Sequence, residues 1–322
     1  MRAFVTGGSG FIGSHLIDAL VRDGWLVRAL SHRAPLLQED RIETLNGDIC
    51  DRAVLFDGLK EIDVVFHLAS ALGSTAISKD EFFRINTLGT EVVLEAARAR
   101  PVSRIIHLSS AGVLGAVRPG DIADESYPPK PASVYDRTKL EAEKTALWAA
   151  GQGMDIVIVR PGWAYGPRDR RTFKLIKTVD KKKIIVMPRG KARQTPVYID
   201  DLIRGLLMAA RSGKKGEIYH LAGREILTAG EIVKAIAGAC AKKRPAVFLP
   251  LFPFSMAAHF FEKLYSPLGK EPPLNRAKLS FFSHSKPLSV QKARQELGFS
   301  AEVDFHRGIR LTVAWYREQG WL

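Results

Sequence analysis

A tyrosine and a lysine four residues apart, Tyr135 and Lys139, form the pair best suited to acid–base chemistry. Apolar and small residues recur at helical spacing from Val134 to Leu147, and residues four apart share one face of a helix. The ammonium group would then lie beside the phenol and lower its pKa from about 10. A phenol tuned in this way exchanges a proton with a substrate oxygen. Because Tyr-x-x-x-Lys also occurs on ordinary helices, the pair needs support from the rest of the chain.

A serine pair, Ser109 and Ser110, ends a predicted strand over residues 103–110. Parallel sheets place their ligands at the carboxyl ends of strands. Such a pair is usually a turn or a helix cap. If Tyr135 lies beside it, the Ser110 hydroxyl becomes a hydrogen-bond donor to a substrate oxygen.

A glycine-rich turn lies between a predicted strand, residues 2–6, and a predicted helix, residues 14–21. Strand, glycine turn and helix are the context that the dinucleotide-binding fingerprint requires. Glycines let the backbone approach a pyrophosphate, and the helix directs its N-terminal amides at the phosphates. We therefore expect a dinucleotide cofactor here. The turn consists of Gly7, Gly8, Ser9, Gly10, Phe11, Ile12 and Gly13.

The residues after the second predicted strand, 25–30, bear on the type of cofactor. An acidic residue at this point usually binds the ribose hydroxyls of NAD. Here the chain has Ser31, His32 and Arg33 instead. Because His32 and Arg33 could meet a 2′-phosphate, the sequence favours NADP over NAD. NAD stays open, since later loop residues can compensate.

The order of elements predicts an α/β fold with a Rossmann-type doubly wound parallel sheet, because strands alternate with helices. We expect residues 1–165 to form the dinucleotide-binding domain, with segments near 195–240 returning to it. Residues 166–322 would mainly form a smaller C-terminal α/β substrate-binding domain. The remaining expected elements are strands at 42–49, 63–70, 154–160 and 218–222 and helices at 52–59, 79–100 and 134–147.

A phenylalanine-rich segment, residues 245–275, shows no regular pattern. Its apolar side chains could form a lid over an apolar substrate, a surface-binding element or part of the core. Core is the default expectation for such residues.

Composition and charge limit the possible functions. The 322 residues, 46% hydrophobic and 25% charged, are typical of a soluble globular enzyme. The two cysteines form neither a disulfide framework nor a zinc pattern, and no signal peptide or membrane span is visible, so we expect a cytoplasmic protein. The net charge of +14 is concentrated in residues 168–193, which hold eleven Lys or Arg. This charge is typical of a plain basic surface or of a protein that binds nucleic acid, anionic lipid or anionic small molecules. Apart from Phe173 the stretch lacks aromatic residues, which weakens the case for single-stranded nucleic acid, and we expect no nucleic-acid partner.

Taken together, these features resemble the extended short-chain dehydrogenase/reductase family, the NAD(P)-dependent epimerase/dehydratase group. The resemblance runs over essentially the whole chain. Its motifs are residues 6–13, Gly47-Asp48-Ile49, His67-Leu68-Ala69, Asn86, Ser109-Ser110, Tyr135 with Lys139, Arg160-Pro161-Gly162, Tyr165-Gly166-Pro167 and residues 198–201.

The resemblance implies roles for these positions. Tyr135 would be the acid–base and Ser110 its partner on the substrate oxygen, while hydride moves between the nicotinamide and a carbinol or ketone carbon. The family often dimerises through the helices that here hold Asn86 and Tyr135, which implies a homodimer. Residues expected to hold the cofactor are Gly7, Gly10, Phe11, Ile12 and Gly13 at the pyrophosphate, Asp48 and Ile49 at the adenine, Lys139 at the nicotinamide ribose, and Leu68, Ala69, Asn86, Tyr135 and Pro161.

Departures from the family pattern bear on the substrate. Ala111 and Gly112 follow Ser110 where sugar-nucleotide dehydratases carry an Asp-Glu pair, and Trp163 stands where epimerases usually have Asn. Residues 248–261 and 272–276 look more like the 3β-hydroxysteroid and sterol-carboxylate dehydrogenase branch. Arg193 and Arg276 argue against that branch, because both could bind the diphosphate of a sugar nucleotide.

Three hypotheses follow. The first is a dehydrogenase or ketoreductase acting on a bulky, partly apolar substrate, such as a steroid-like or lipid-linked alcohol. The second is a sugar-nucleotide epimerase with tightly held NAD. The third is a non-catalytic, cofactor-sensing protein. Substrate binding is assigned to Ser110, Trp163, Arg193 and Arg276, with no metal site; peripheral membrane contact is left open.

Overall fold

A seven-stranded sheet forms the centre of the computed structural model, which describes residues 1–32, 40–72, 77–181, 185–188, 191–241, 246–265 and 272–322. Its strand order is β11-β6-β5-β4-β1-β2-β3, and every pairing is parallel. The order reverses direction between β1 and β4, as in a doubly wound sheet, so the predicted fold class is confirmed. The strands are β1 (Arg2–Thr6), β2 (Leu26–Ser31), β3 (Ile42–Asn46), β4 (Val64–His67), β5 (Arg104–Leu108), β6 (Ile156–Pro161) and β11 (Ile218–Leu221).

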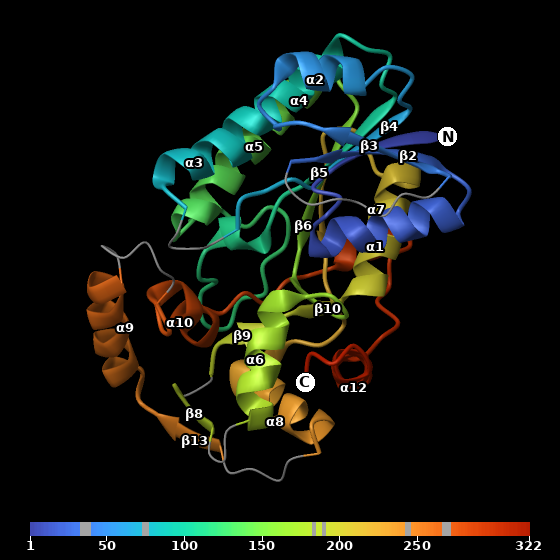
Figure 1. Cartoon of the computed structure of the whole chain (residues 1–322). Helices are drawn as coiled ribbons and strands as arrows, with labels where there is room; N and C mark the ends of the chain where they lie inside the picture. The colour runs from blue at the N-terminus through green and yellow to red at the C-terminus, as the bar shows by residue number, and fades with distance from the viewer. Residues whose placement is uncertain (33–39, 73–76, 182–184, 189–190, 242–245, 266–271) are drawn as a thin grey trace.

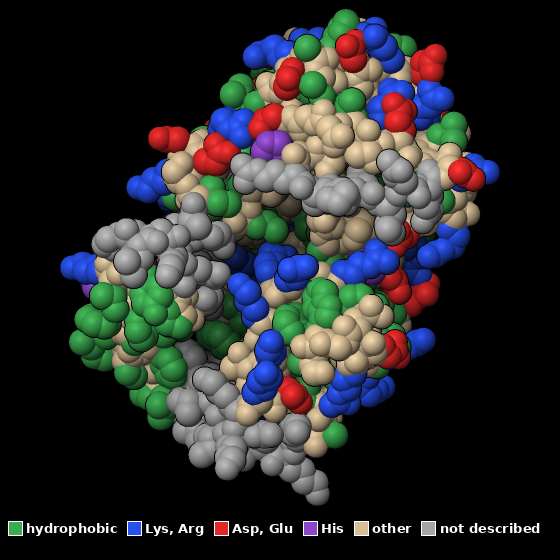
Figure 2. All heavy atoms as spheres, viewed as in Figure 1, with side chains coloured by type: hydrophobic (Ala, Val, Ile, Leu, Met, Phe, Trp, Pro, Cys, Tyr) green, Lys and Arg blue, Asp and Glu red, His purple; other side chains and the backbone are tan. Residues whose placement is uncertain are grey.

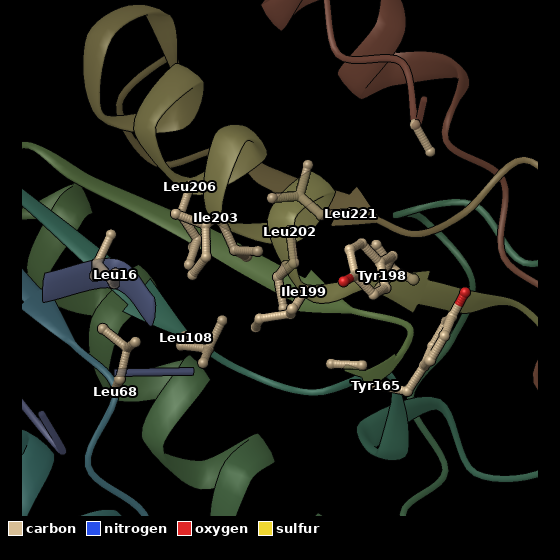
Figure 3. Packing of buried hydrophobic residues seen from close by; sticks show 14 of the residues in the cluster. Leu16, Leu68, Leu108, Tyr165, Tyr198, Ile199, Leu202, Ile203, Leu206 and Leu221 are labelled. Atoms are coloured by element: carbon tan, nitrogen blue, oxygen red, sulfur yellow. The ribbon is translucent and has the colours of Figure 1, made fainter. Parts of the chain in front are cut away.

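Helices cover both faces of this sheet (Figure 1). Helices α1 (Phe11–Arg22) and α7 (Ile199–Ser212) lie on one face, and α2 (Arg52–Gly58), α4 (Gly89–Arg98) and α5 (Val134–Gly151) lie on the other. Alternate residues of each strand point to opposite faces and build two separate cores. Figure 3 shows the first of these cores, in which Leu16, Leu108 and Leu202 pack from α1, β5 and α7.

The helix expected over residues 79–100 contains a change of pitch. It consists of α3 (Lys79–Phe83), one π-helical turn η1 (Arg84–Leu88) and α4. The Ser78 side chain caps its N-terminus by accepting the Glu81 amide over 3.1 Å. The π turn carries Asn86, and such turns often occur at functional sites.

A second group of elements lies below the carboxyl edge of the sheet in Figure 1. The chain enters it through β7 (Trp163–Tyr165), which pairs with β10 (Pro196–Tyr198) just before α7. After α7 the chain returns to the main sheet, because residues 218–221 form β11 and pair with β6, as expected. The other elements are α6 (Arg170–Lys181), β8 (Ile185–Pro188) with β13 (Ala246–Leu249), β9 (Arg193–Gln194) with β12 (Leu227–Thr228), α8 (Ala229–Ala239), α9 (Leu251–Tyr265), α10 (Arg276–Ser283), α11 (Gln291–Leu297) and α12 (Phe305–Glu318).

Helix α9 corrects two expectations about residues 245–275. The segment is not irregular, because fifteen of its residues form this helix. Its aromatic residues are not mainly core either: Phe252 and Phe260 are 71% and 64% exposed, and Ala258 is its one buried residue. The sequence hid the helix because apolar residues occupy nearly every side of it. No helix in the described part of the chain is long and apolar enough to cross a bilayer.

Candidate active site

The ends of β1 and β4 come together at the point where the strand order reverses. Gly7, directly after β1, has φ +73°, and a Cβ there would lie 2.8 Å from the Ala69 amide nitrogen. No other residue fits this position, because both the backbone conformation and the space exclude a side chain. The crevice beyond such a switch point is where open α/β sheets bind ligands.

The glycine turn and the start of α1 have the features that a pyrophosphate requires. The Gly10 amide donates to the Gly7 carbonyl over 3.0 Å, and a Cβ on Gly13 would lie 2.1 Å from that carbonyl oxygen. Helix α1 begins with Phe11 and Ile12, has no side chain capping its N-terminus and no acid in its first turn. Its first amides are thus available to an anion. These residues fit a dinucleotide cofactor, and their contacts with it stay predictions.

Thr6 fixes the loop that follows β4. Its hydroxyl oxygen accepts the Leu68 and Ala69 amides over 3.1 and 3.0 Å and lies 2.8 Å from His67 Nδ1. Because Leu68 and Ala69 lie beside Gly7, this threonine holds together the two loops on which a cofactor would rest. His67 is a packed, hydrogen-bonded strand residue.

His67 links this loop to the helices behind the sheet. Its Nε2 lies 2.8 Å from Thr90 Oγ1, and the Thr90 hydroxyl donates to the Asn86 carbonyl over 2.7 Å. Thr90 has only one proton to donate, so it accepts from His67 Nε2–H, which leaves Nδ1 to accept from Thr6. Burial keeps the ring neutral by lowering its pKa to about 3.

Asn86 joins the loop after β4 to α5, the helix that carries the dyad of Tyr135 and Lys139. Its Oδ1 accepts the Ala71 amide over 2.7 Å and the Ser70 hydroxyl over 3.1 Å, and its Nδ2 donates to Thr138 Oγ1 over 2.9 Å. Thr138 in turn donates to the Tyr135 carbonyl over 2.9 Å. The amide of Asn86 is therefore engaged within the protein, and its expected contact with a cofactor stays a prediction.

Tyr135 meets Ser110, as the sequence predicted. The phenol lies near the Ser110 and Ser70 hydroxyls, and both favour its ionised form by lowering its pKa. Ser110 caps a short 3-10 helix, η2 (Ala111–Leu114), by accepting the Gly112 amide over 3.0 Å, so its own proton is free to point at the phenol oxygen. The dyad helix α5 begins beside them in a capping box made by Ser133 and Asp136.

Lys139 is almost fully buried, at 2% exposure, one turn along α5 from Tyr135. Burial lowers the pKa of its ammonium group to about 8, and the negative charge of Glu143 opposes this effect. Burial lowers the pKa values of His67 and His107, whose rings lie 5.4 Å apart, and the charge of Lys139 lowers them further. Lys139 is thus a buried cation whose pKa lies only slightly above neutral pH.

The main influence on the Tyr135 phenol is burial, and the expected effect of Lys139 on its pKa stays a prediction. The pKa of Tyr135 is raised by burial, and the charge of Arg171 on α6 opposes this rise, followed by the nearby hydroxyls of Ser110 and Ser70. The physical reason is that the phenol loses solvation when α5 packs against the sheet.

A buried ion pair joins α5 to β6. Arg160 on β6 donates to Glu143 from Nε over 2.9 Å and from Nη2 over 2.6 Å, and both side chains are at most 3% exposed. The Ser109 hydroxyl donates to the same carboxylate over 2.6 Å. Ser109 thus holds α5 in place, while Ser110 faces the phenol.

The residues predicted to contact the adenine and its ribose have other surroundings in this structure. Arg84 holds the Asp48 carboxylate through two hydrogen bonds of 2.8 and 3.0 Å, which lower its pKa to about 2. His32 is exposed and lies 3.7 Å from Asp48, whereas Ile49 is buried. Arg33 lies outside the described residues. The cofactor contacts of these four residues stay predictions.

The predicted substrate residues lie in two settings. Trp163, just beyond Pro161 at the end of β6, packs in an aromatic cluster with ring distances of 5.0 Å to Phe281 and 6.2 Å to Phe305. The half-buried Arg193 pairs with no acid within the described part of the chain, so its charge is available to an anion. The side chain of Arg276 lies outside the described residues. All of these assignments stay predictions.

Sequence reasoning did not single out several residues of this site. Thr6, Ser70 and His107 belong to it through contacts between distant segments, which leave no local pattern. His107 is fully buried, and neither ring nitrogen has a partner within the described residues. Arg171 stood within the basic stretch, but only the fold shows that its charge acts on Tyr135.

Comparison with known proteins adds to this geometry. Residues 3–222 match the profile of the NAD dependent epimerase/dehydratase family. The chain is 34% identical over 318 residues to a 4-hydroxy-2-methyl-3-oxo-4-farnesyl-3,4-dihydroquinoline-1-oxide ketoreductase of Stigmatella aurantiaca, covering 96% of this chain and 95% of that one. It is 30% identical to a dTDP-glucose 4,6-dehydratase of Streptomyces niveus, covering 99% and 93%.

A solved structure also resembles the fold. It is UDP-glucuronic acid 4-epimerase from Bacillus cereus in complex with UDP-glucuronic acid and NAD, with a TM-score of 0.80 and 26% identity, covering 99% of this chain and 100% of that one. These relatives include a ketoreductase, a dehydratase and an epimerase, so similarity alone leaves the substrate open.

Proposed function

This chain belongs to the NAD dependent epimerase/dehydratase family of extended short-chain dehydrogenases/reductases, a family of NAD-dependent enzymes, and from that premise we propose that it is a net oxidoreductase acting on a bulky, partly apolar alcohol or ketone. The observation that carries the proposal is that Tyr135 lies beside Ser110, with Lys139 one turn further along the same helix. All three lie where the strands end, beside a glycine turn that fits a pyrophosphate.

The protein's own groups account for the proton. When an alcohol is oxidised, Tyr135 as phenolate takes the hydroxyl proton, while the Ser110 hydroxyl donates a hydrogen bond to the same substrate oxygen. In ketone reduction Tyr135 returns that proton. A bound nicotinamide would accept or supply the hydride. Lys139, buried one turn along α5 from Tyr135, would hold the ribose of that cofactor.

The residues around the dyad favour an apolar substrate. Trp163 and Phe281 form an aromatic wall beyond the end of β6, where a sugar-nucleotide epimerase usually has an amide side chain. The elimination carried out by dehydratases lacks its acid and base here, because Ala111 and Gly112 follow Ser110. The similarity to a ketoreductase named for a farnesylated substrate supports the same class.

A second candidate is a nucleotide-sugar epimerase with tightly held NAD. Arg193, which has no acidic partner within the described residues, and Arg171, whose charge reaches Tyr135, favour it because both could bind a diphosphate. Epimerisation returns the hydride to the same substrate, so it gives no net redox change.

The choice of cofactor and the homodimer are also part of this proposal. Among the family's cofactors we favour NADP for this chain, because His32 and Arg33 replace the usual acid after β2. A homodimer through α4 and α5 is supported by Trp148 on α5, which is 62% exposed.

The experiment follows the nicotinamide absorbance with NAD(H) and NADP(H). One set of reactions contains hydroxysteroids, prenylated aromatic ketones and long-chain secondary alcohols, and another contains UDP- and dTDP-sugars. Net oxidation or reduction in step with turnover of an apolar compound supports the proposal. Interconversion of two sugar nucleotides without an absorbance change supports the epimerase instead.

A further inference from the structure

Helix α9 exposes a continuous apolar stripe. Phe252, Met256, Phe260 and Leu264 are 71%, 60%, 64% and 52% exposed. Because they are four residues apart, they lie one above another on a single face of the helix. Contiguous apolar surface of this kind marks an interaction site more often than scattered exposed residues do.

The polar residues on the stripe point to the chemistry of its partner. His259 and Lys263 are exposed beside it, whereas the single acid of the helix, Glu262, is half-buried. The exposed surface of α9 therefore combines apolar and cationic groups without an acid. This combination suits an interface that is apolar inside and anionic at its surface.

Helix α6 supplies more positive charge on the same side of the molecule. Arg170, Arg171, Lys174 and Lys181 are all exposed on this helix. Figure 2 shows Lys and Arg side chains over α6 and hydrophobic side chains over α9 on one face, with a hollow between them. The whole chain has a net charge of +14, so this face attracts anionic surfaces and repels a second copy.

A short chain of contacts connects the stripe to the candidate active site. Helix α9 packs against α10, and Phe281 of α10 meets the Trp163 ring edge-on at 5.0 Å. Trp163 follows the end of β6, where the substrate is expected. A surface bound by α9 would therefore lie next to the aromatic wall of the site.

We propose that α9 docks this protein on a bilayer that contains anionic phospholipid. The apolar stripe enters the boundary between headgroups and acyl chains, and the cations of α6 meet the lipid phosphates. A helix of fifteen residues is about 22 Å long, so it lies along a hydrocarbon layer of about 30 Å and does not cross it. That the apolar substrate reaches the site from the lipid rests on the proposed function; the docking itself does not.

The test is co-sedimentation of the full chain with vesicles, without substrate or cofactor. Vesicles of phosphatidylcholine alone are compared with vesicles that also contain phosphatidylglycerol. We expect binding to the anionic vesicles, weakened by added salt because the charges are exposed. The double variant Phe252→Ser/Phe260→Ser should bind more than about tenfold more weakly, since two large side chains lose their apolar contact.

Two further variants separate the contributions. Lys181→Glu/Lys263→Glu should lose the preference for anionic vesicles while the apolar stripe stays intact. Leu311→Ser is the matched control, because Leu311 is 44% exposed on α12, away from the stripe, and its binding should match that of the wild type. Circular dichroism of each variant checks the fold.

The inference is overturned if the wild type binds anionic vesicles no better than Phe252→Ser/Phe260→Ser does. It is also overturned if light scattering without lipid shows an oligomer that this double variant dissociates, since a second copy would then cover the stripe. Vesicle binding without turnover of any apolar compound would contradict the proposed function alone. Turnover of an apolar compound without vesicle binding would contradict the docking alone.

Discussion

Gly112 and Asp136 lie so close together that position 112 has no room for a side chain: a Cβ there would be 1.9 Å from the Asp136 Oδ1 atom. Asp136 follows Tyr135 directly and belongs to the capping box at the start of α5. A glutamate at position 112, as in the dehydratase pattern, would therefore require the Asp136 side chain to leave its place in the capping box. The dyad helix and the loop after Ser110 are fitted to each other without that acid.

Gly112→Ala tests this fit. We expect the free energy of unfolding to fall by about 1–3 kcal/mol, because the methyl group overpacks a filled site. Turnover should fall as well, since the strain acts on the capping box beside Tyr135. Urea unfolding and steady-state rates measure the two effects. Gly238→Ala on α8, where nothing lies within 4 Å of the added carbon, is the control. It should lower neither quantity, and the free energy of unfolding should rise by up to about 1 kcal/mol, because alanine favours the helix over glycine.

The central sheet was predictable because its evidence is local. Alternating strands and helices gave the doubly wound fold, and the glycine turn lies in a context that few other structures share. Tyr135 and Ser110 were predicted to meet because one begins a helix and the other ends a strand at the same edge. These are patterns in neighbouring residues, so the sequence contains them directly.

The remaining features depend on contacts between distant segments. The bonds of Asn86 to Ser70 and Thr138, and the buried pair of Arg160 and Glu143, leave no mark in any single stretch. Helix α9 escaped prediction because its apolar residues surround the helix and hide the period. The pKa of Tyr135 depends on burial, which only the packed structure reveals.

Lys139→Met should stabilise the protein at neutral pH. Burial holds the folded pKa of Lys139 near 8, below the unfolded value of 10.5, so the folded state binds fewer protons between these two pH values. The cost of burying the ammonium is therefore fully present below pH 8 and disappears as the pH rises toward 10.5. The difference between the two pKa values corresponds to about 3 kcal/mol of stability at neutral pH.

The measurement is the urea midpoint of wild type and Lys139→Met from pH 6 to about 10.5. The variant should be more stable at the acidic end, and its advantage should shrink as the pH rises. A constant difference across this range would show that Lys139 does not titrate as the structure indicates. Lys144→Met, at an exposed position on the same helix, should show no such trend.

Arg171→Gln should move the alkaline limb of alcohol oxidation to higher pH. The reactive form is the phenolate, and Arg171 is the cation that lowers the pKa of Tyr135. Removing its charge raises that pKa, so kcat/KM should reach its plateau at a higher pH than in the wild type. Arg170→Gln, one residue away, is the matched control. Equal profiles for Arg171→Gln and wild type would remove this role for Arg171.

Glu143→Gln should lower the free energy of unfolding by about 3–5 kcal/mol, because it leaves the Arg160 charge buried without a counter-charge. Replacing both residues, as in Glu143→Leu/Arg160→Met, should cost less than the single change, since the Arg160 charge is then no longer buried without a counter-charge. Urea unfolding of both variants gives the comparison. A double variant less stable than Glu143→Gln would mean that the pair contributes net stability.

The central claim is that Tyr135 transfers the substrate proton, and the most direct test is the kcat of Tyr135→Phe on an apolar substrate that the wild type oxidises or reduces. Phenylalanine keeps the ring and removes only the hydroxyl, and Tyr127→Phe is the control at a tyrosine away from the dyad. We predict that kcat falls by a factor of about 10²–10⁴, while cofactor binding and folding stay as in the wild type. A kcat equal to that of the wild type, with the cofactor bound and the protein folded, would contradict the account.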